Sequence, residues 1–105
     1  MDKTIGYEWK DSTLILRLPK EIDHHSSKEI REETERWIQT SRVSHMIFDF
    51  SCTTFMDSSG VGALLGRYKR MRERGGTVSI YGADARIQRI LRISGVDKLI
   101  PGMGE

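Results

Sequence analysis

Apolar and polar residues alternate near the start of the chain with the two-residue period of β-strands. The alternation runs through residues 4–10 and 13–18, and the three leucines of the second segment fall on one face. Asp11-Ser12, between the two segments, favours a turn. These residues therefore predict an N-terminal β-hairpin.

Three later segments repeat their apolar residues at helical spacing. The first covers about residues 26–40, where Ser26 and Glu29 have the spacing of a capping box. The second extends over 57–74 and ends at a pair of glycines, and a third, shorter helix ends at Gly95. The pattern thus predicts three helices after the hairpin.

Strand-like segments separate these helices. Residues 46–50 are almost continuously apolar, which predicts a central strand with helices on both of its faces. Residues 77–81 predict a further strand, and Leu99-Ile100 a short edge strand. The order ββαβαβα predicts right-handed crossovers and largely parallel later strands. The expected fold is a single α/β domain over 1–105, with a mixed sheet of four to five strands packed with helices.

Parallel strands bring the loops at their carboxyl ends to the same edge of a sheet. In this chain those loops are residues 21–25, after the hairpin, and 51–58, after the central strand. We therefore expect Asp23 to lie near Ser58.

The second helix is expected to begin with a side chain suited to capping it. Asp57 fits the N-cap position, because its carboxylate can accept hydrogen bonds from the first free N–H groups of the helix. Ser58 and Ser59 then occupy the first turn, where the helix dipole favours a phosphate. Local chemistry leaves two interpretations of these serines, solvated hydroxyls or a phosphorylation site.

The second helix also contains three glycines, Gly60, Gly62 and Gly66. Each costs roughly 1 kcal/mol relative to alanine in a helix interior, and less in the first turn. Two explanations remain open at this point. Either the helix packs closely on the sheet, or the backbone of a partner, or a nucleotide, approaches this turn.

Three segments of the chain resemble a known family. Residues 21–25 (Glu-Ile-Asp-His-His), 55–62 (Phe-Met-Asp-Ser-Ser-Gly-Val-Gly) and 65–69 (Leu-Gly-Arg-Tyr-Lys) are similar to the STAS domain of bacterial anti-sigma factor antagonists, most of all to members that act in sporulation. The resemblance extends from the second strand to Ser94-Gly95. It implies the STAS fold and a binding protein rather than an enzyme.

The resemblance also implies a switch. In that family the serine directly after the aspartate, here Ser58, is phosphorylated by the anti-sigma factor, which is itself a serine kinase, and a serine phosphatase reverses the modification. The unphosphorylated form binds the anti-sigma factor and releases the sigma factor. The partner-binding residues that the resemblance and the loop argument together predict are Asp23, His24, Asp57, Ser58, Ser59, Gly60 and Gly62.

The chain departs from the family pattern in two places. Pro19-Lys20 occupies a turn that often carries glycine, and the sequence stops at Glu105, before the C-terminal helix of many members. Neither departure involves Ser58. The second leaves the last packing face and the oligomeric state open.

Composition and charge exclude several other classes of function. The chain has 17 Lys and Arg against 15 Asp and Glu, and a net charge of +2 is too small to indicate nucleic-acid binding. The basic end of the second helix suits the helix dipole and is expected to be solvated. No apolar run reaches the ~18 residues of a membrane span, and no signal-peptide pattern is present, so we expect a cytoplasmic protein without a membrane partner.

The sequence predicts neither a metal nor a cofactor. Cys52 is the only cysteine, which excludes an internal disulfide and a thiolate metal cluster, and we expect it to be partly buried. His24 and His25 are adjacent, so they cannot both point to one metal in an extended segment. We expect them to be loop residues.

The same residues do not form the sequence motifs that an enzyme would need. A hydrolase triad of Ser58 with His25 and Asp23 lacks the G-x-S-x-G elbow. Gly60-Val61-Gly62 lacks the lysine and the spacing of a phosphate loop. The alternatives that remain are a STAS phosphorylation switch in another signalling assembly, such as general stress control, and a module that binds nucleotide weakly.

Overall fold

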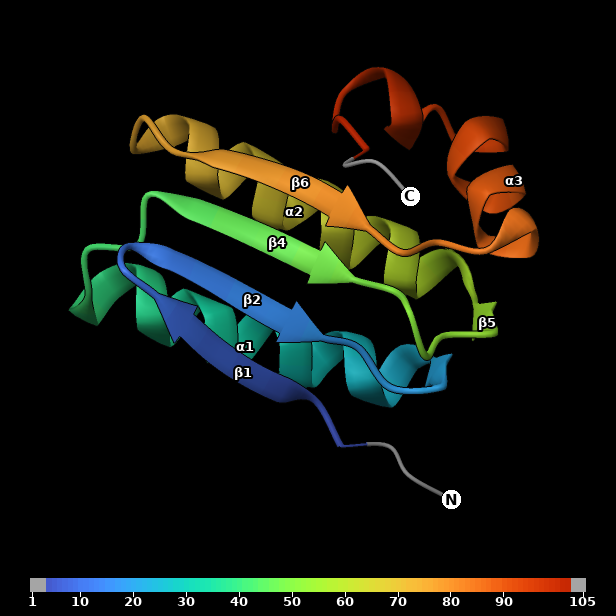
Figure 1. Ribbon diagram of the computed structural model, residues 1–105, viewed down its shortest axis with the longest axis horizontal. Coiled ribbons are helices and arrows are strands. Elements are labelled where there is room, and N and C mark those ends of the chain that lie inside the picture. The colour runs from blue at the N-terminus through green and yellow to red at the C-terminus, as the bar shows by residue number, and fades with distance from the viewer. Residues whose placement is uncertain (1–3, 103–105) are drawn as a thin grey trace.

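The structure, a computed structural model, describes residues 4–102. Figure 1 shows the chain, in which strands and helices alternate after an N-terminal hairpin. In order, the elements are β1 (Gly6–Lys10), β2 (Thr13–Arg17), β3 (Glu21–Ile22), α1 (His24–Thr40), β4 (His45–Asp49), β5 (Phe55–Met56), α2 (Ser58–Glu73), β6 (Thr77–Tyr81), α3 (Ala85–Ile93) and the 3-10 helix η1 (Val96–Lys98).

Four strands form a mixed sheet in the order β1-β2-β4-β6 (Figure 1). β1 and β2 are antiparallel, whereas β2 pairs with β4, and β4 with β6, in parallel. Leu14 lies opposite Met46, and Phe48 lies opposite Ile80, so buried side chains line up across the strands. The predicted hairpin and the mixed sheet with parallel later strands are confirmed.

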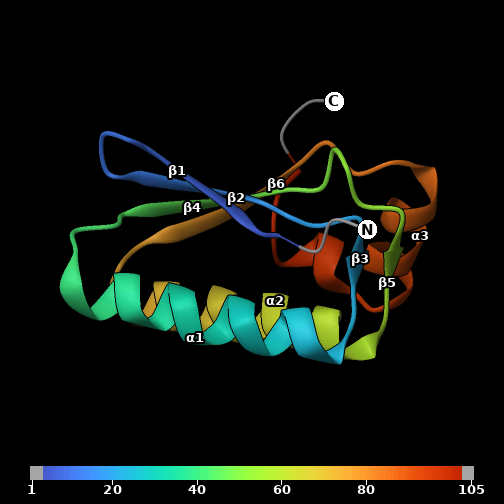
Figure 2. The same cartoon turned by 90° about the horizontal axis from the view of Figure 1, so that it is seen from below.

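Both long helices cover the same face of this sheet, as Figure 2 shows. The core lies between the two layers and includes the three leucines of the second predicted strand, Leu14, Leu16 and Leu18. Within residues 4–102, no helix is both long enough and apolar enough to cross a membrane.

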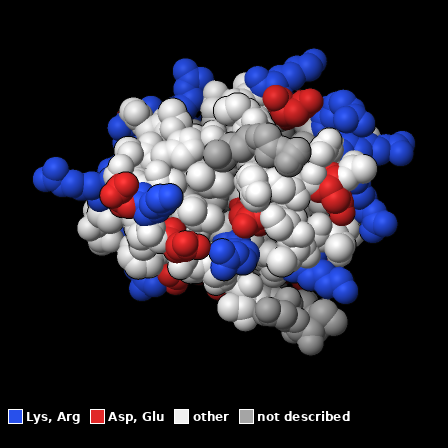
Figure 3. Space-filling model, viewed as in Figure 1, with Lys and Arg blue, Asp and Glu red and all other residues white. Residues whose placement is uncertain are grey.

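The prediction that helices cover both faces of the central strand is wrong. Along β4, Met46 and Phe48 are buried against the helices, whereas His45, Ile47 and Asp49 are only half-buried on the other face. Ile47 is the residue that made the segment 46–50 almost continuously apolar, but no helix covers the face on which it lies (Figure 2). That open face carries interspersed charges (Figure 3), and Arg17 lies 3.2 Å from Glu8.

Helix α1 begins two residues earlier than predicted, and its cap differs. Asp23 is the N-cap: its Oδ1 accepts from the Ser26 N–H (3.0 Å), and the Ser26 hydroxyl accepts from the Asp23 N–H (2.9 Å). The predicted capping box of Ser26 and Glu29 is therefore wrong, because Ser26 already lies inside the helix and is buried. His24 and His25 are exposed residues of the first turn rather than loop residues.

Three further differences from the prediction lie outside the main sheet. The short strands β3 and β5, which no period in the sequence revealed, pair in parallel with Ile22 opposite Met56. Leu99-Ile100 is not a strand: it follows η1, and the parallel bridge to Ile80 is made by Gly102 instead. Cys52, expected to be partly buried, is exposed.

An ion cluster fastens α1 to α2. Glu35 Oε1 lies 3.0 Å from Arg67 Nη1, and its Oε2 lies 3.0 Å from Arg70 Nε. Burial alone would raise the pKa of Glu35, but the hydrogen bonds from the two arginines outweigh it and hold the pKa below its usual range. The Arg67 side chain is only 11% exposed, so it depends on this carboxylate.

We predict that Glu35→Ala lowers the free energy of unfolding by about 1–2 kcal/mol, between the values for exposed and buried ion pairs. Glu33→Ala is the matched control, because its partner Arg36 is largely exposed, and it should cost about 0.5 kcal/mol or less. Urea unfolding measures both. The Glu35 contribution is present above the unfolded pKa of ~4.3 and lost as pH falls through the lower folded pKa. An equal effect of the two variants, or one that grows in acid, would contradict this account.

Candidate phosphorylation and docking site

Helices α1 and α2 begin side by side because β3 and β5 end side by side. The two strands pair over two residues each, and the Asp57 N–H donates to the Ile22 carbonyl at 3.1 Å. Each strand is followed directly by an aspartate N-cap, Asp23 for α1 and Asp57 for α2. Figure 2 shows both helices running from this edge in the same direction. The structure therefore brings the two predicted loops together.

Asp57 caps α2 through a single carboxylate oxygen. Its Oδ1 accepts from the Ser59 N–H (2.9 Å), the Ser59 hydroxyl (2.5 Å) and the Gly60 N–H (3.3 Å). The Ser59 hydroxyl is the main reason that the pKa of Asp57 is lowered; the two N–H groups add to it, while burial and the nearby Asp23 carboxylate oppose it. Asp57 is thus a negative charge at neutral pH, as the N-cap prediction required.

The two serines of this turn have different surroundings. The Ser59 hydroxyl is half-buried, donates to Asp57, and lies 3.3 Å from the Ser27 hydroxyl of α1, which is fully buried. Ser58 is exposed, and within residues 4–102 its hydroxyl makes no hydrogen bond. A kinase could reach the Ser58 oxygen without breaking an internal contact, whereas Ser59 would lose two.

The electrostatics of this edge come from both helices. Two parallel helices place two N-terminal dipole ends, each roughly half a positive charge, next to each other. Asp23 and Asp57 partly neutralise them and occupy the N–H groups closest to the caps. An anion on Ser58 would therefore be close to two favourable helix ends and also close to two carboxylates.

Two glycines of α2 have different surroundings, which bears on whether close packing or an approaching partner explains them. A Cβ on Gly60 would meet Met56 Cγ at 2.5 Å and Ile22 Cγ2 at 2.9 Å, so close packing on the short strands explains this residue. Gly60 is buried, and it serves the predicted site from inside rather than as a surface contact. Gly62 is exposed, and a Cβ there would meet nothing within 4 Å, so it leaves room beside the first turn.

Sequence reasoning gave no role to two residues that shape the site. Phe55 lies two residues before the Asp57 cap and is 48% exposed, while its neighbour Met56 is buried. The only sign of this in the sequence was the opposite facing of two successive strand residues. Ser27 joins α1 to the Ser59 hydroxyl, and nothing local in the sequence indicated it. His24 and His25 lie at the rim, and residues 4–102 contain no group of side chains arranged to hold a metal ion.

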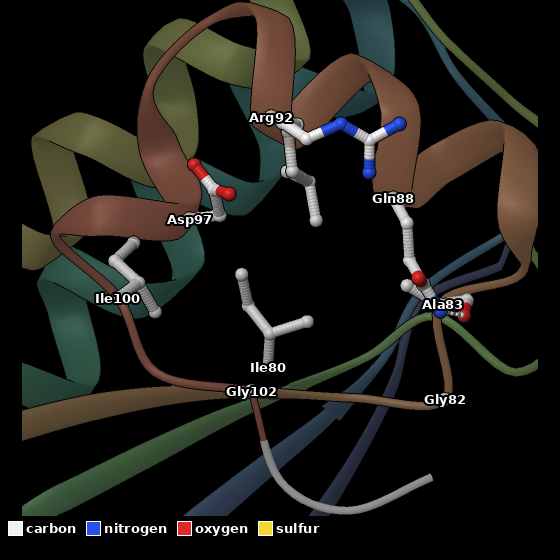
Figure 4. A pocket seen from close by; sticks show the side chains of 9 residues that line it. Ile80, Gly82, Ala83, Gln88, Arg92, Asp97, Ile100 and Gly102 are labelled. Carbon is white, nitrogen blue, oxygen red and sulfur yellow. Dashed lines mark hydrogen bonds between the residues drawn. The ribbon is translucent and has the colours of Figure 1, made fainter.

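A separate cavity of about 360 Å³ lies between the end of β6, α3 and η1 (Figure 4). Its apolar lining comes from Ile80, Leu91 and Ile100. Arg92 and Asp97 stand at its margin in Figure 4. None of the predicted site residues lines this cavity. The cavity therefore does not support the alternative in which a nucleotide approaches the glycines of α2.

Comparison with known proteins agrees with the geometry. The family model of the STAS domain matches residues 5–104, and the chain belongs to this family. The anti-sigma F factor antagonist of Paenibacillus polymyxa is 36% identical over 101 residues, which cover 96% of this chain and 86% of that protein. The predicted fold and the resemblance to anti-sigma factor antagonists are confirmed.

Solved structures of the anti-sigma factor antagonist SpoIIAA are also similar to this chain. The unphosphorylated form has a TM-score of 0.87 at 28% identity, covering 97% of this chain and 90% of that one. The phosphorylated form has a TM-score of 0.79 at the same identity, covering 97% and 93%. The resemblance to the sporulation members of the family is thereby confirmed.

We predict opposite effects for alanine at the two glycines. Gly60→Ala should destabilise the protein by about 1–3 kcal/mol, because the new methyl overpacks the short strands. Gly62→Ala should be neutral or stabilise by up to about 1 kcal/mol, because it removes a helix-weakening glycine in open space. Thermal and urea unfolding of the two variants measure the difference. Equal stabilities would rule out the packing explanation for Gly60.

We predict that Ser59→Ala raises the pKa of Asp57, since it removes the hydrogen bond that lowers it most. NMR titration of the Asp57 carboxyl carbon measures this directly. Asp57→Ala should cost about 1 kcal/mol of stability through the lost cap, and Asp57→Asn less. Because the folded pKa is depressed, the advantage of Asp57 over asparagine should fade as pH drops through that pKa. An unchanged pKa in Ser59→Ala would contradict the assignment.

Proposed function

We propose that this protein is an anti-sigma factor antagonist that Ser58 phosphorylation switches off. In the unphosphorylated form, the edge where α1 and α2 begin binds an anti-sigma factor, and the bound sigma factor is released. The observation that carries this proposal is the exposed Ser58 hydroxyl at the start of α2, between the capped ends of two helices. The names of the similar proteins support the same class of partner.

The switch works by charge and size at this edge. A phosphate on Ser58 adds about −1.5 to −2 charges. Asp23 and Asp57 are already there, so the edge would carry about −3.5 to −4 before the helix dipoles are counted. The helix N-termini stabilise the phosphate within the fold, while an approaching protein surface is repelled. That the phosphorylated and unphosphorylated SpoIIAA structures are both similar to this chain supports a fold that survives the modification.

The proposed partners follow from this switch. The anti-sigma factor is itself the serine kinase, and a serine phosphatase restores the binding form. The antagonist supplies a surface and an acceptor hydroxyl, so it is neither an enzyme nor a cofactor-binding protein, and its ATP-dependent partner places it in the cytoplasm. The contact residues that we propose at the surface are Asp23, His24, Asp57, Ser58, Ser59 and Gly62, with Gly60 supporting them from below.

The decisive experiment is incubation with the cognate anti-sigma factor and ATP, followed by mass mapping. We predict one phosphate, on Ser58, that is absent in Ser58→Ala and retained in Ser59→Ala. Phosphate on Ser59 alone, or none, would overturn the site assignment.

Binding tests the other half of the proposal. Ser58→Asp should weaken the complex with the anti-sigma factor at least about tenfold, equivalent to about 1.4 kcal/mol. Ser12→Asp, an exposed serine in the hairpin turn at the other end of the sheet, adds the same charge and should leave the affinity unchanged. If Ser58→Asp binds as tightly as the unmodified protein, charge at this edge is not what blocks docking.

A further inference from the structure

The outer face of α3 carries an exposed stripe of two arginines and an isoleucine. Arg86, Arg89 and Ile93 are spaced i, i+3 and i+7, so they lie along one side of the helix. The opposite side, with Ile87 and Leu91, is buried in the core. Ile93 is 75% exposed, the highest value among the large apolar side chains of residues 4–102. The buried side packs α3 onto the core, and the three residues of the stripe are not part of that core.

The arginines of this stripe have no carboxylate partner within the described part of the chain. Four arginines outside α3, namely Arg17, Arg36, Arg67 and Arg70, form ion pairs with aspartate or glutamate. Arg72 and Arg74 instead bind Tyr68 and backbone carbonyls. No ion pair among residues 4–102 involves α3. Figure 3 shows basic side chains crowding the side of the molecule where α3 lies. The face therefore offers guanidinium groups to a partner.

The stripe begins at the candidate docking site. Arg86 Nη1 donates to the Thr54 carbonyl at 3.4 Å, and Thr54 immediately precedes the exposed Phe55. β5 then leads through Met56 to the Asp57 cap, and Figure 2 shows α3 beside β5. A partner seated on the starts of α1 and α2 would thus meet Phe55 and Arg86 next.

We propose that Phe55 of β5 and the α3 stripe (Arg86, Arg89 and Ile93) together form a second part of the docking surface for the anti-sigma factor. This inference rests on the proposed function. The stripe fits an acidic segment of that protein, with carboxylates opposite the arginines and an apolar recess for Ile93. A nucleic acid is disfavoured, because its phosphates would approach the Asp23 and Asp57 carboxylates at the adjoining edge.

Association kinetics with the purified anti-sigma factor test the charges of the stripe. The double variant Arg86→Ala/Arg89→Ala should lower the association rate constant about five-fold at low salt, and the difference should vanish near 0.5 M salt. The matched control is Lys10→Ala/Arg42→Ala, which removes the same charge from exposed positions at the opposite end of the sheet. It should leave the rate within about two-fold of the unmodified protein.

The apolar end of the stripe acts mainly on dissociation. Ile93→Ser should raise the dissociation rate constant about five- to tenfold, whereas Leu99→Ser, an exposed apolar residue outside the stripe, should not change it. Arg86, Arg89, Ile93 and Leu99 are all exposed, so the melting temperatures of these variants should stay close to that of the unmodified protein.

The outcomes separate this inference from the proposed function. If the unmodified protein binds and Ser58→Asp does not, but the stripe variants match their controls at every salt concentration, the second contact area is wrong and the switch stands. If the unmodified protein does not bind the anti-sigma factor, the proposed function fails, and the α3 stripe as its docking surface fails with it. Weaker binding of the stripe variants with intact controls supports the inference.

Discussion

The pairing of β3 with β5 is the constraint on which the candidate site depends. Each strand has two residues, yet Ile22 and Met56 are both buried, and Gly60 packs against both. Backbone hydrogen bonds from Thr54 to the Lys20 carbonyl (2.8 Å) and from Asp57 to the Ile22 carbonyl (3.1 Å) extend the pairing at both ends. This short ladder sets where α1 and α2 begin, and so sets the surroundings of Ser58.

Starting two parallel helices at one edge has an electrostatic cost that other contacts offset. The two helix dipoles lie side by side and parallel, so they repel each other, and the Asp23 carboxylate opposes ionisation of Asp57. Against this, each cap accepts N–H groups of its own helix, and Ser27 touches Ser59 between the helices. Further along, Glu35 binds arginines of α2. The edge is therefore held by several contacts and is already polarised before any phosphate arrives, which suits a local switch.

Local signals in the sequence predicted much of this arrangement. Asp57 as a cap, the glycines that end α2 and the leucine alternation of β2 are short-range features, and the structure confirms each one. The parallel topology then brought the two loops to one edge by a general rule. The chain could be assigned to its family on the residues of these same loops.

The errors came where tertiary contacts decide. A two-residue strand has no measurable period, so β3 and β5 were not predicted, and with them the early start of α1 was missed. Ser26 has the right spacing to cap, but it is buried inside the first turn once Asp23 takes that position. Hydrophobicity alone led to two further errors. Ile47 suggested that helices cover both faces of the central strand, but it faces the open side of the sheet. Leu99 suggested an edge strand, but its side chain is exposed and it follows η1.

The central claim is that phosphate on Ser58 blocks docking while the fold remains. Calorimetric titration of the anti-sigma factor into the enzymatically phosphorylated protein, beside the unmodified protein, tests it most directly. The account predicts tight binding of the unmodified protein and at least about tenfold weaker binding of the phosphorylated one, equivalent to about 1.4 kcal/mol or more, with similar melting temperatures for both samples. Equal affinities, or a phosphorylated protein that has lost its folded structure, would contradict it.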